Sequence, residues 1–157
     1  MSMLSQKRKD QLSDLLRRYP TTRSALIPAL WVVQEEHGFI SDEAIEYLAK
    51  TLDLAAADIY GTVTFYTMFN RRKIGRHHIQ LCTNICCWLK GSGEMLDYLK
   101  AKLNVCVGET TPDGMWTLST VECLGACGGA PMMMVDMDYH ENLTIEGIDE
   151  ILCRYCR

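Results

Sequence analysis

Cysteine placement is the feature that most constrains this chain. All eight cysteines of the 157 residues fall from position 82 onward. The N-terminal segment turns charged at Lys7 and lacks the apolar core of a signal peptide, which predicts a reducing, cytoplasmic location. In such a compartment, clustered cysteines bind metal or carry out redox chemistry more often than they form disulfides. Five of them lie in two short segments, LCTNICCW at 81–88 and VECLGACGG at 121–129.

Charge and hydropathy argue against two classes of partner. The formal net charge is -4 and there is no Lys- or Arg-rich stripe, so nucleic acid, whose phosphates need a basic face, is not expected to bind. The most apolar run, 25–33, is too short to span a bilayer and contains Pro28. We therefore expect no direct insertion into a membrane.

Residues 1–72 contain no cysteine and predict a small helical bundle. The stretch QKRKDQLSDLLRRY places its leucines on one stripe, which is the period of a half-buried helix. Ser41 stands before two acidic residues and a helical apolar pattern, as an N-cap does. The expected helices are 6–19; 22–37, capped by Thr22, kinked at Pro28 and ended at Gly38; a third capped by Ser41, with Ala44, Ile45, Leu48 and Leu52 on its apolar face; and 58–69.

Residues 73–157 change pattern and predict a mixed domain. HHIQLC and MWTLSTVE alternate polar and apolar side chains, as half-buried strands do, and MMMVDM is apolar on both faces, as an interior strand is. The order strand, helix, strand, strand, helix is typical of a thioredoxin-like domain. The expected fold class is therefore α+β, an N-terminal helical bundle followed by a thioredoxin-like α/β domain. Its expected elements are a strand ending at Cys82, a helix over 87–104, strands over 115–122 and 132–137, and a helix over 148–155.

The two cysteine segments supply thiolates in short pairs, which suit zinc or an iron–sulfur cluster because each needs four. One pair is Cys123 with Cys127, and the other is Cys82 with either Cys86 or Cys87. If Cys87 is the ligand, a continuous helix would leave its sulfur about 140° from that of Cys82, so a loop is expected between them. A C-x4-C loop is similar to the first pair of plant-type ferredoxins and favours iron. Spacing alone does not choose between Cys86 and Cys87.

A longer series of motifs resembles one family. C-x4-C-W-L-K-G, then GETTPDG and ECLGACGGAP, with DIYGTVTFY upstream, resemble the small 2Fe-2S subunit of NADH:quinone oxidoreductase, respiratory complex I. The resemblance covers nearly the whole chain and implies a thioredoxin-like 2Fe-2S ferredoxin. Cys86 stands where that family usually has another residue type. Carried over by position, the resemblance implies that one 2Fe-2S cluster is bound by Cys82, Cys87, Cys123 and Cys127.

The resemblance also implies a function in electron transfer. A 2Fe-2S centre accepts one electron whereas NADH delivers a hydride, so a flavin must divide the pair, and the chain shows no flavin or NADH fingerprint. The implied protein is a subunit of an NADH dehydrogenase (quinone) complex with no catalytic residue of its own, its cluster close to the FMN of the NADH-binding partner subunit. FMN and NADH would bind only to that partner, on which residues 1–72 would dock. Further iron–sulfur subunits would complete a peripheral arm at the cytoplasmic face of the inner membrane.

Three alternatives share parts of this pattern. The equivalent diaphorase subunit of an NAD-linked or bifurcating hydrogenase, or of a formate dehydrogenase, has the same motifs. An adaptor could use the same four cysteines for structural zinc. A thiol–disulfide enzyme would act through Cys153 and Cys156, although this pair ends a helix instead of starting one and is expected to be a surface pair. Of the other candidate ligands, Cys106 is expected to be buried, and His77 and His78 to lie at an edge or the surface.

Overall fold

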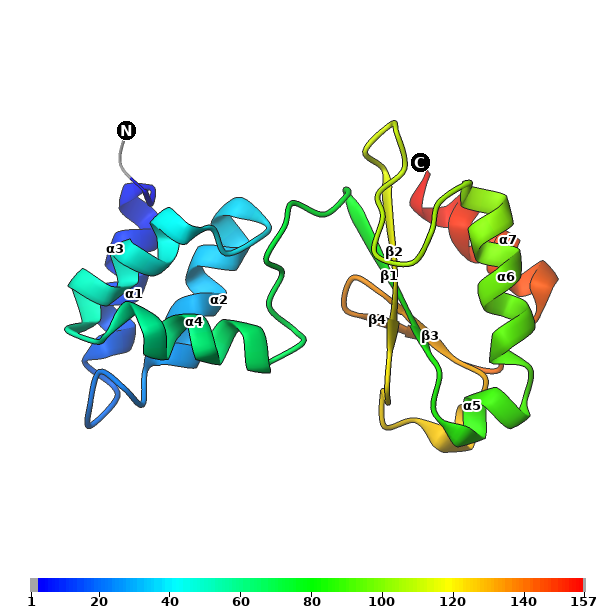
Figure 1. Ribbon diagram of the computed structural model, residues 1–157, viewed down its shortest axis with the longest axis horizontal. Helices are drawn as coiled ribbons and strands as arrows, with labels where there is room; N and C mark the ends of the chain where they lie inside the picture. Colours follow the sequence, from blue (N-terminus) through cyan, green and yellow to red (C-terminus); the bar gives the residue numbers. More distant parts are fainter. Residues whose placement is uncertain (1–2, 157) are drawn as a thin grey trace. The chain divides into compact units, whose positions relative to one another are not determined.

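The computed structural model describes residues 3–156 and confirms the predicted α+β fold class. Within that range the chain forms seven α-helices and one four-stranded sheet (Figure 1). It divides into two compact units, one ending at Lys73 and the other beginning at Ile74, and each has a hydrophobic core of its own. Because all four strands follow Ile74, we call them the helical unit and the thioredoxin-like unit.

The helical unit packs four short helices around one apolar core. They are α1 (Gln6–Leu16), α2 (Leu26–His37), α3 (Asp42–Leu52) and α4 (Ala56–Phe65). α3 matches its prediction closely: Ser41 Oγ accepts a hydrogen bond from the Ala44 N–H (3.2 Å), and all four predicted apolar positions are buried. Leu12 of α1, Leu30 of α2 and Ile59 of α4 are buried in the same core.

Four helix boundaries in this unit differ from those predicted. α1 ends at Leu16 instead of residue 19. α2 begins at Leu26, and residues 22–25 form turns, so Thr22 is not its N-cap. A helix starting at Thr22 would place Pro28 where its ring meets a preceding carbonyl, whereas in the first turn of α2 its missing N–H removes no intrahelical hydrogen bond. Gly38 does end α2 in the left-handed conformation (φ 79°), as predicted. α4 begins and ends earlier than predicted, since Tyr66 is already extended.

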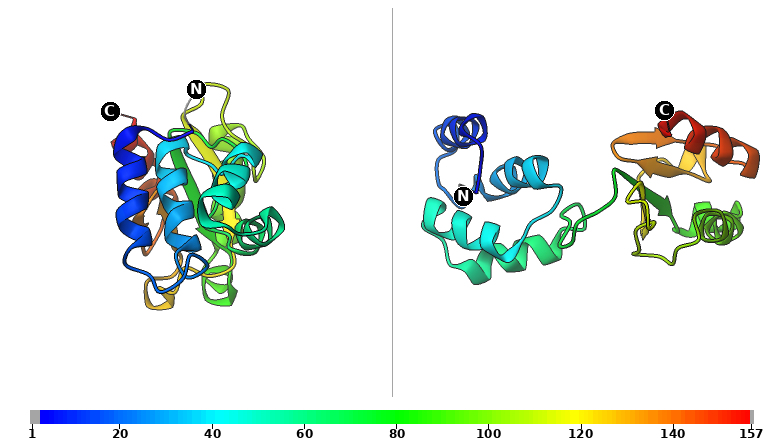
Figure 2. Two further views of the ribbon diagram at one scale, coloured as in Figure 1. Left: turned by 90° about the vertical axis from the view of Figure 1, so that its left-hand side faces the viewer. Right: turned by 90° about the horizontal axis from the view of Figure 1, so that it is seen from above.

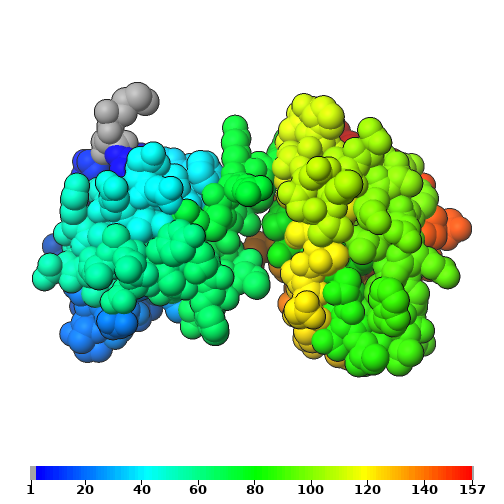
Figure 3. Space-filling model, in the orientation of Figure 1, coloured from blue at the N-terminus to red at the C-terminus, as the bar shows by residue number. Residues whose placement is uncertain are grey.

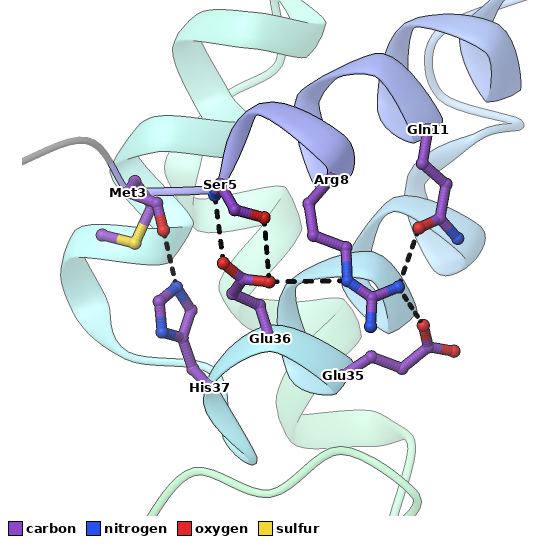
Figure 4. Close-up of polar contacts among 7 residues, drawn as sticks. All are labelled: Met3, Ser5, Arg8, Gln11, Glu35, Glu36 and His37. Atoms are coloured by element: carbon purple, nitrogen blue, oxygen red, sulfur yellow. Dashed lines mark hydrogen bonds and ion pairs between the residues drawn. The ribbon is translucent and has the colours of Figure 1, made fainter.

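A polar clasp joins the start of α1 to the end of α2 (Figure 4). Ser5 donates from its backbone N–H and its hydroxyl to the two carboxylate oxygens of Glu36, at 3.0 and 3.2 Å. Arg8 pairs with Glu35 at 2.6 Å and lies 3.5 Å from Glu36. The hydrogen bond from the Ser5 backbone lowers the pKa of Glu36. The folded state therefore favours the ionised carboxylate.

We expect Glu36→Gln to weaken the docking of α1, most strongly near neutral pH. A carboxylate whose pKa is lowered on folding stabilises the fold above its unfolded pKa, and the contribution is lost as pH falls through the folded pKa. The wild-type and variant chains should therefore converge in acid. Hydrogen exchange of the α1 amides at about pH 7 and about pH 3 measures this. Glu46→Gln, at an exposed position, is the control, and equal protection of α1 in both variants would contradict the prediction.

The thioredoxin-like unit is a mixed sheet with helices on one side. The strands are β1 (His77–Cys82), β2 (Trp116–Val121), β3 (Met133–Val135) and β4 (Asp138–His140), and the helices are α5 (Ile85–Leu89), α6 (Ser92–Leu103) and α7 (Ile145–Tyr155). The sheet order is β2-β1-β3-β4, with β1 parallel to β2 and the other pairs antiparallel. Figures 1 and 2 show α6 and α7 on the same side of this sheet. Ile79 of β1 is buried with Leu99 of α6 and Ile148 of α7.

Several element boundaries in this unit also differ from those predicted. The single helix expected over 87–104 is two helices, because Gly91 is left-handed (φ 91°) and breaks the chain between α5 and α6. β3 is interior as predicted, but it ends at Val135. The left-handed Asp136 (φ 57°) then turns the chain into β4, which was not predicted. α7 begins at Ile145, three residues early, because Thr144 caps it by accepting from the Gly147 N–H.

The two histidines of β1 were wrongly expected at an edge or the surface. β1 lies between β2 and β3, and the side chain of His77 is only 14% exposed. Its Nδ1 lies 2.8 Å from Asp136 Oδ2, and His78 Nε2 lies 2.7 Å from Ser119 Oγ. Burial lowers the pKa of His78. Asp136 and Ser119 each partner one ring nitrogen of these histidines inside the unit, whereas His77 Nε2 is buried without a hydrogen-bond partner in residues 3–156.

Three of the remaining cysteines are exposed thiols. Cys106, expected to be buried, is exposed, and its backbone N–H donates to Glu109. It follows the end of α6 in a turn, where apolar neighbours in sequence do not imply burial. Cys153 and Cys156 are exposed, as predicted.

Candidate metal centre

The two cysteine-bearing segments leave the sheet at one edge (Figure 1). β1 and β2 are parallel, and Cys82, the last residue of β1, lies opposite Val121, the last residue of β2. The carboxyl ends of parallel strands meet at the same edge, so the turn after Cys82 and the loop after Val121 start side by side. This register brings together cysteines that are about forty residues apart in sequence.

Cys82 and Cys87 form an inner, buried pair. Both lie in a small apolar cluster with Met132, and each residue is at most 2% exposed. The Cys82 thiol donates to the Glu122 carbonyl (3.9 Å) and lies close enough to Cys87 to add to the effect of burial in raising its pKa, because the chain turns at Thr83 and Asn84 and then enters α5. Cys82 and Cys87 do not share a helix, as expected, but the loop between them is limited to Thr83 and Asn84, because α5 begins at Ile85.

Cys123 and Cys127 form an outer, exposed pair on the loop that follows β2. The Gly125 N–H donates to Cys123 Sγ at 3.3 Å, with Gly125 in the left-handed conformation (φ 77°). Tyr139 of β4 holds the middle of this loop, since its hydroxyl donates to the Leu124 carbonyl at 2.9 Å. A 3₁₀ turn, η1 (Cys127–Gly129), then leads to a cis peptide bond before Pro131.

The thiols of the two pairs lie close enough to affect each other, since Cys127 adds to the effect of burial in raising the pKa of Cys87. Cys127 hydrogen-bonds to Cys123 and to Cys86, and the bond to Cys86 is the main cause that raises the pKa of Cys127. Burial raises the pKa of Cys87 to about 11, and a backbone hydrogen bond from Met132 works against that rise. These thiols are therefore protonated when no metal is bound, and metal binding must release their protons.

The residues at this edge fit a 2Fe-2S cluster. Within residues 3–156, no three His, Cys, Asp or Glu side chains converge closely enough to hold a single metal ion. The thiols form two pairs, and a 2Fe-2S cluster takes two thiolates at each of its two irons. One sulfur of each pair also accepts a backbone hydrogen bond, which favours the negative charge of a thiolate-bound cluster. Such a cluster takes up and releases one electron.

Tyr139 and Met132 support the site and were not identified from the sequence. Neither has the thiolate that holds an iron–sulfur cluster, and Met132 acts through its backbone. Tyr139 acts from β4, which the sequence pattern did not predict. The alternation of Asp138, Tyr139 and His140 after a turn was the available signal.

We expect Tyr139→Phe to release iron faster without abolishing cluster formation. Losing one hydrogen bond of about 0.5–1.5 kcal/mol loosens the loop that carries the outer pair. Iron transfer from the reconstituted protein to a coloured chelator should then be about two- to tenfold faster. Tyr60→Phe is the matched control, since Tyr60 is similarly exposed (50% against 52%) and lies in the helical unit. Unchanged kinetics in Tyr139→Phe would show that the Leu124 contact does not hold the loop.

Comparisons with known proteins agree on one family. Residues 12–156 match the family described as "Thioredoxin-like [2Fe-2S] ferredoxin". The chain is 46% identical over 144 residues to an NADH-quinone oxidoreductase subunit of Rhizobium meliloti (strain 1021), covering 92% of this chain and 86% of that protein. It is 45% identical over 137 residues to the mitochondrial NADH dehydrogenase [ubiquinone] flavoprotein 2 of Dictyostelium discoideum, covering 85% of this chain and 56% of that protein.

A solved structure has the same fold. The crystal structure of an NAD+-reducing [NiFe]-hydrogenase in the air-oxidized state superposes with a TM-score of 0.72 over 83% of this chain and 22% of that chain. At 20% identity this likeness concerns the fold alone. The family match and the two close relatives confirm the resemblance drawn from the motifs and with it the 2Fe-2S cofactor. The chain therefore belongs to the thioredoxin-like [2Fe-2S] ferredoxin family, together with its relatives from NADH-quinone oxidoreductase.

Proposed function

We propose that this chain is the 2Fe-2S electron-transfer subunit of an NADH:quinone oxidoreductase complex. Its cluster is bound by Cys82, Cys87, Cys123 and Cys127. The observation that carries the proposal is the meeting of two thiol pairs at one edge of the sheet, in a chain 46% identical to an NADH-quinone oxidoreductase subunit. The cluster lies close to the FMN of the NADH-binding partner subunit.

The chain works as part of a complex and does not catalyse alone. NADH gives up two electrons as a hydride, and a one-electron cluster cannot accept a hydride. FMN and NADH therefore bind to the partner subunit, which divides the electron pair and passes single electrons on. Further iron–sulfur subunits of the same complex receive them.

The helical unit docks on the partner through α4. Asp58 is the only charged residue of this helix, and within it only Ile59 and Val63 are buried. Figure 3 shows α4, in teal to green, lying at the surface of the helical unit. Tyr60 is 50% exposed and Phe65 is 76% exposed. A helix with so little charge and with large apolar side chains in solvent is typical of a protein interface.

The complex places this subunit in a peripheral arm at the cytoplasmic face of the inner membrane. No helix in residues 3–156 is long and apolar enough to cross a bilayer. In this arrangement the chain would reach the membrane only through its partner subunits.

Anaerobic reconstitution tests the proposed function. The full chain, supplied with iron and sulfide, should take up about two irons and show an EPR signal on reduction. Mixed with the purified FMN-containing subunit from the same organism, it should be reduced when NADH is added, and NADH alone should not reduce it. An iron-free chain, or a loaded chain that the NADH-treated flavin subunit neither binds nor reduces, would overturn the proposal. Copurification with hydrogenase or formate dehydrogenase subunits would instead assign it to those complexes.

A further inference from the structure

An apolar patch borders the thiol site. α5 carries Cys86 and Cys87, and its other three side chains, Ile85, Trp88 and Leu89, are 64%, 59% and 76% exposed. We call these three residues the α5 patch. They occupy one short helix beside the exposed outer pair of thiols. Monomeric proteins rarely leave three large apolar side chains together in solvent unless another surface covers them.

Trp88 is held in a fixed position although it is exposed. Its indole lies against the first turn of α6, so closely that a Cβ built on Gly93 would be 3.0 Å from Trp88 Cζ3 and 3.2 Å from Cη2. The backbone around it is also fixed, since the Trp88 N–H donates to the Asn84 carbonyl and the Gly91 N–H donates to the Trp88 carbonyl. A Trp ordered before binding loses little entropy on association, and such residues are enriched among interface hot spots.

The position of the patch indicates what covers it. Electrons must enter and leave through the edge of the sheet where the thiols lie, since the outer pair is exposed there. A protein that delivers or receives those electrons has to approach this edge, and the α5 patch lies on the same edge. The patch itself carries no charge. This favours close apolar contact with a protein over the charged surface of a lipid bilayer.

We propose that the α5 patch is the surface through which the cluster unit docks on the FMN-containing partner, with Trp88 and Leu89 as anchors. This inference rests on the proposed function and adds to it the residues that form the contact at the cluster. Docking there buries the α5 patch and shields the outer thiols from solvent. It also brings the partner close to the cluster, which shortens the path for the electron. The contact is separate from that of α4, which lies in the other unit.

A pair of variants matched in exposure tests the proposal. Leu89 is 76% exposed on α5, and Met137 is 75% exposed in the β3–β4 turn. That turn lies beside His78, at the opposite end of β1 from Cys82. Leu89→Glu and Met137→Glu therefore introduce the same charge at the two ends of the sheet. Each full-length variant is reconstituted, checked for iron content and EPR signal, and titrated against the purified FMN-containing subunit.

We expect Leu89→Glu to weaken binding at least tenfold while keeping its cluster, and Trp88→Ala to do the same. Met137→Glu should bind like the wild type. Wild-type affinity in both Leu89→Glu and Trp88→Ala would overturn the inference while leaving the proposed function intact. So would an equal loss in Met137→Glu, or a patch that mediates only self-association or vesicle binding. A wild-type chain that neither binds nor is reduced by the flavin subunit would overturn the proposed function, and the inference with it.

Discussion

Serine at position 82, 87, 123 or 127 is expected to abolish the 2Fe-2S cluster, and serine at position 86 to leave it in place. Each of the four proposed ligands supplies one of the four thiolates that the cluster requires. A hydroxyl is a poor substitute because iron–sulfur clusters select soft thiolate donors. Iron content should fall from about two per chain to near zero in each of the four variants. Cys86→Ser should keep both the iron and the EPR signal.

Burial and pairing support the choice of Cys87 over Cys86. Cys87 is 1% exposed and lies beside Cys82, so these two thiols would supply one iron of the cluster. Cys86 is only partly buried and hydrogen-bonds to Cys127, which already has Cys123 as its partner. In this assignment Cys86 is a supernumerary thiol beside the outer pair.

Iron and sulfide analysis, with EPR after reduction, measures the outcome in each single variant. Cys106→Ser and Cys153→Ser are controls, because both thiols are exposed and belong to neither pair. Both should keep the full signal. Loss of the cluster in Cys86→Ser together with its retention in Cys87→Ser would show that the ligand assignment is wrong.

Helix caps and apolar periodicity predicted correctly those helices and strands that are stabilised by contacts between residues close together in the sequence. The Ser41 cap, the apolar face of α3 and the alternation of HHIQLC each concern contacts within one element, and the structure has all three. The start of α2, the break at Gly91 and the strand β4 were missed. Each depends on a backbone restriction that apolar periodicity does not reveal: where a helix can accommodate Pro28, and which residues adopt the left-handed turns at Gly91 and Asp136.

The candidate site was predicted in part for the same reason. Spacing identified two thiol pairs, and the resemblance chose Cys87, but neither could show that one pair is buried and the other exposed. That difference arises because α5 folds Cys87 inward against Met132, while the second loop runs along the surface. The supports at Tyr139 and Met132 come from segments whose positions only the assembled sheet defines.

Gly129→Ala is expected to destabilise the thioredoxin-like unit and the loop that carries the outer thiols. A Cβ at Gly129 would lie 2.7 Å from the Cβ of Glu141 and would overlap its carboxylate. The Glu141 carboxylate can rotate away, but the Glu141 Cβ can move only if the backbone of Glu141 moves. That backbone is tied in place, because the Asn142 N–H donates to the Gly129 carbonyl at 2.7 Å. Overpacking of this kind costs about 1–3 kcal/mol.

The adjacent glycine provides the control for this prediction. A Cβ added at Gly128 would meet no atom within 4 Å, and this residue does not need a left-handed backbone, so Gly128→Ala should change stability little. Thermal unfolding and the rate of iron loss to a chelator are measured for both variants. Equal behaviour would mean that the loop relaxes freely around residue 129.

Removing the opposing atom separates steric overlap from any other effect of the methyl group. Glu141→Gly deletes the Cβ that Gly129→Ala would meet. Adding Gly129→Ala to the Glu141→Gly variant should therefore cost much less stability than adding Gly129→Ala to the wild type. Cys127 lies two residues before Gly129 in the same 3₁₀ turn, so iron retention should recover in parallel. Recovery of stability without recovery of iron would mean that Gly129 affects the cluster by a route other than this contact. Recovery of both would identify the close approach of the Gly129 and Glu141 backbones as the contact that holds the outer thiol pair in register with the inner one.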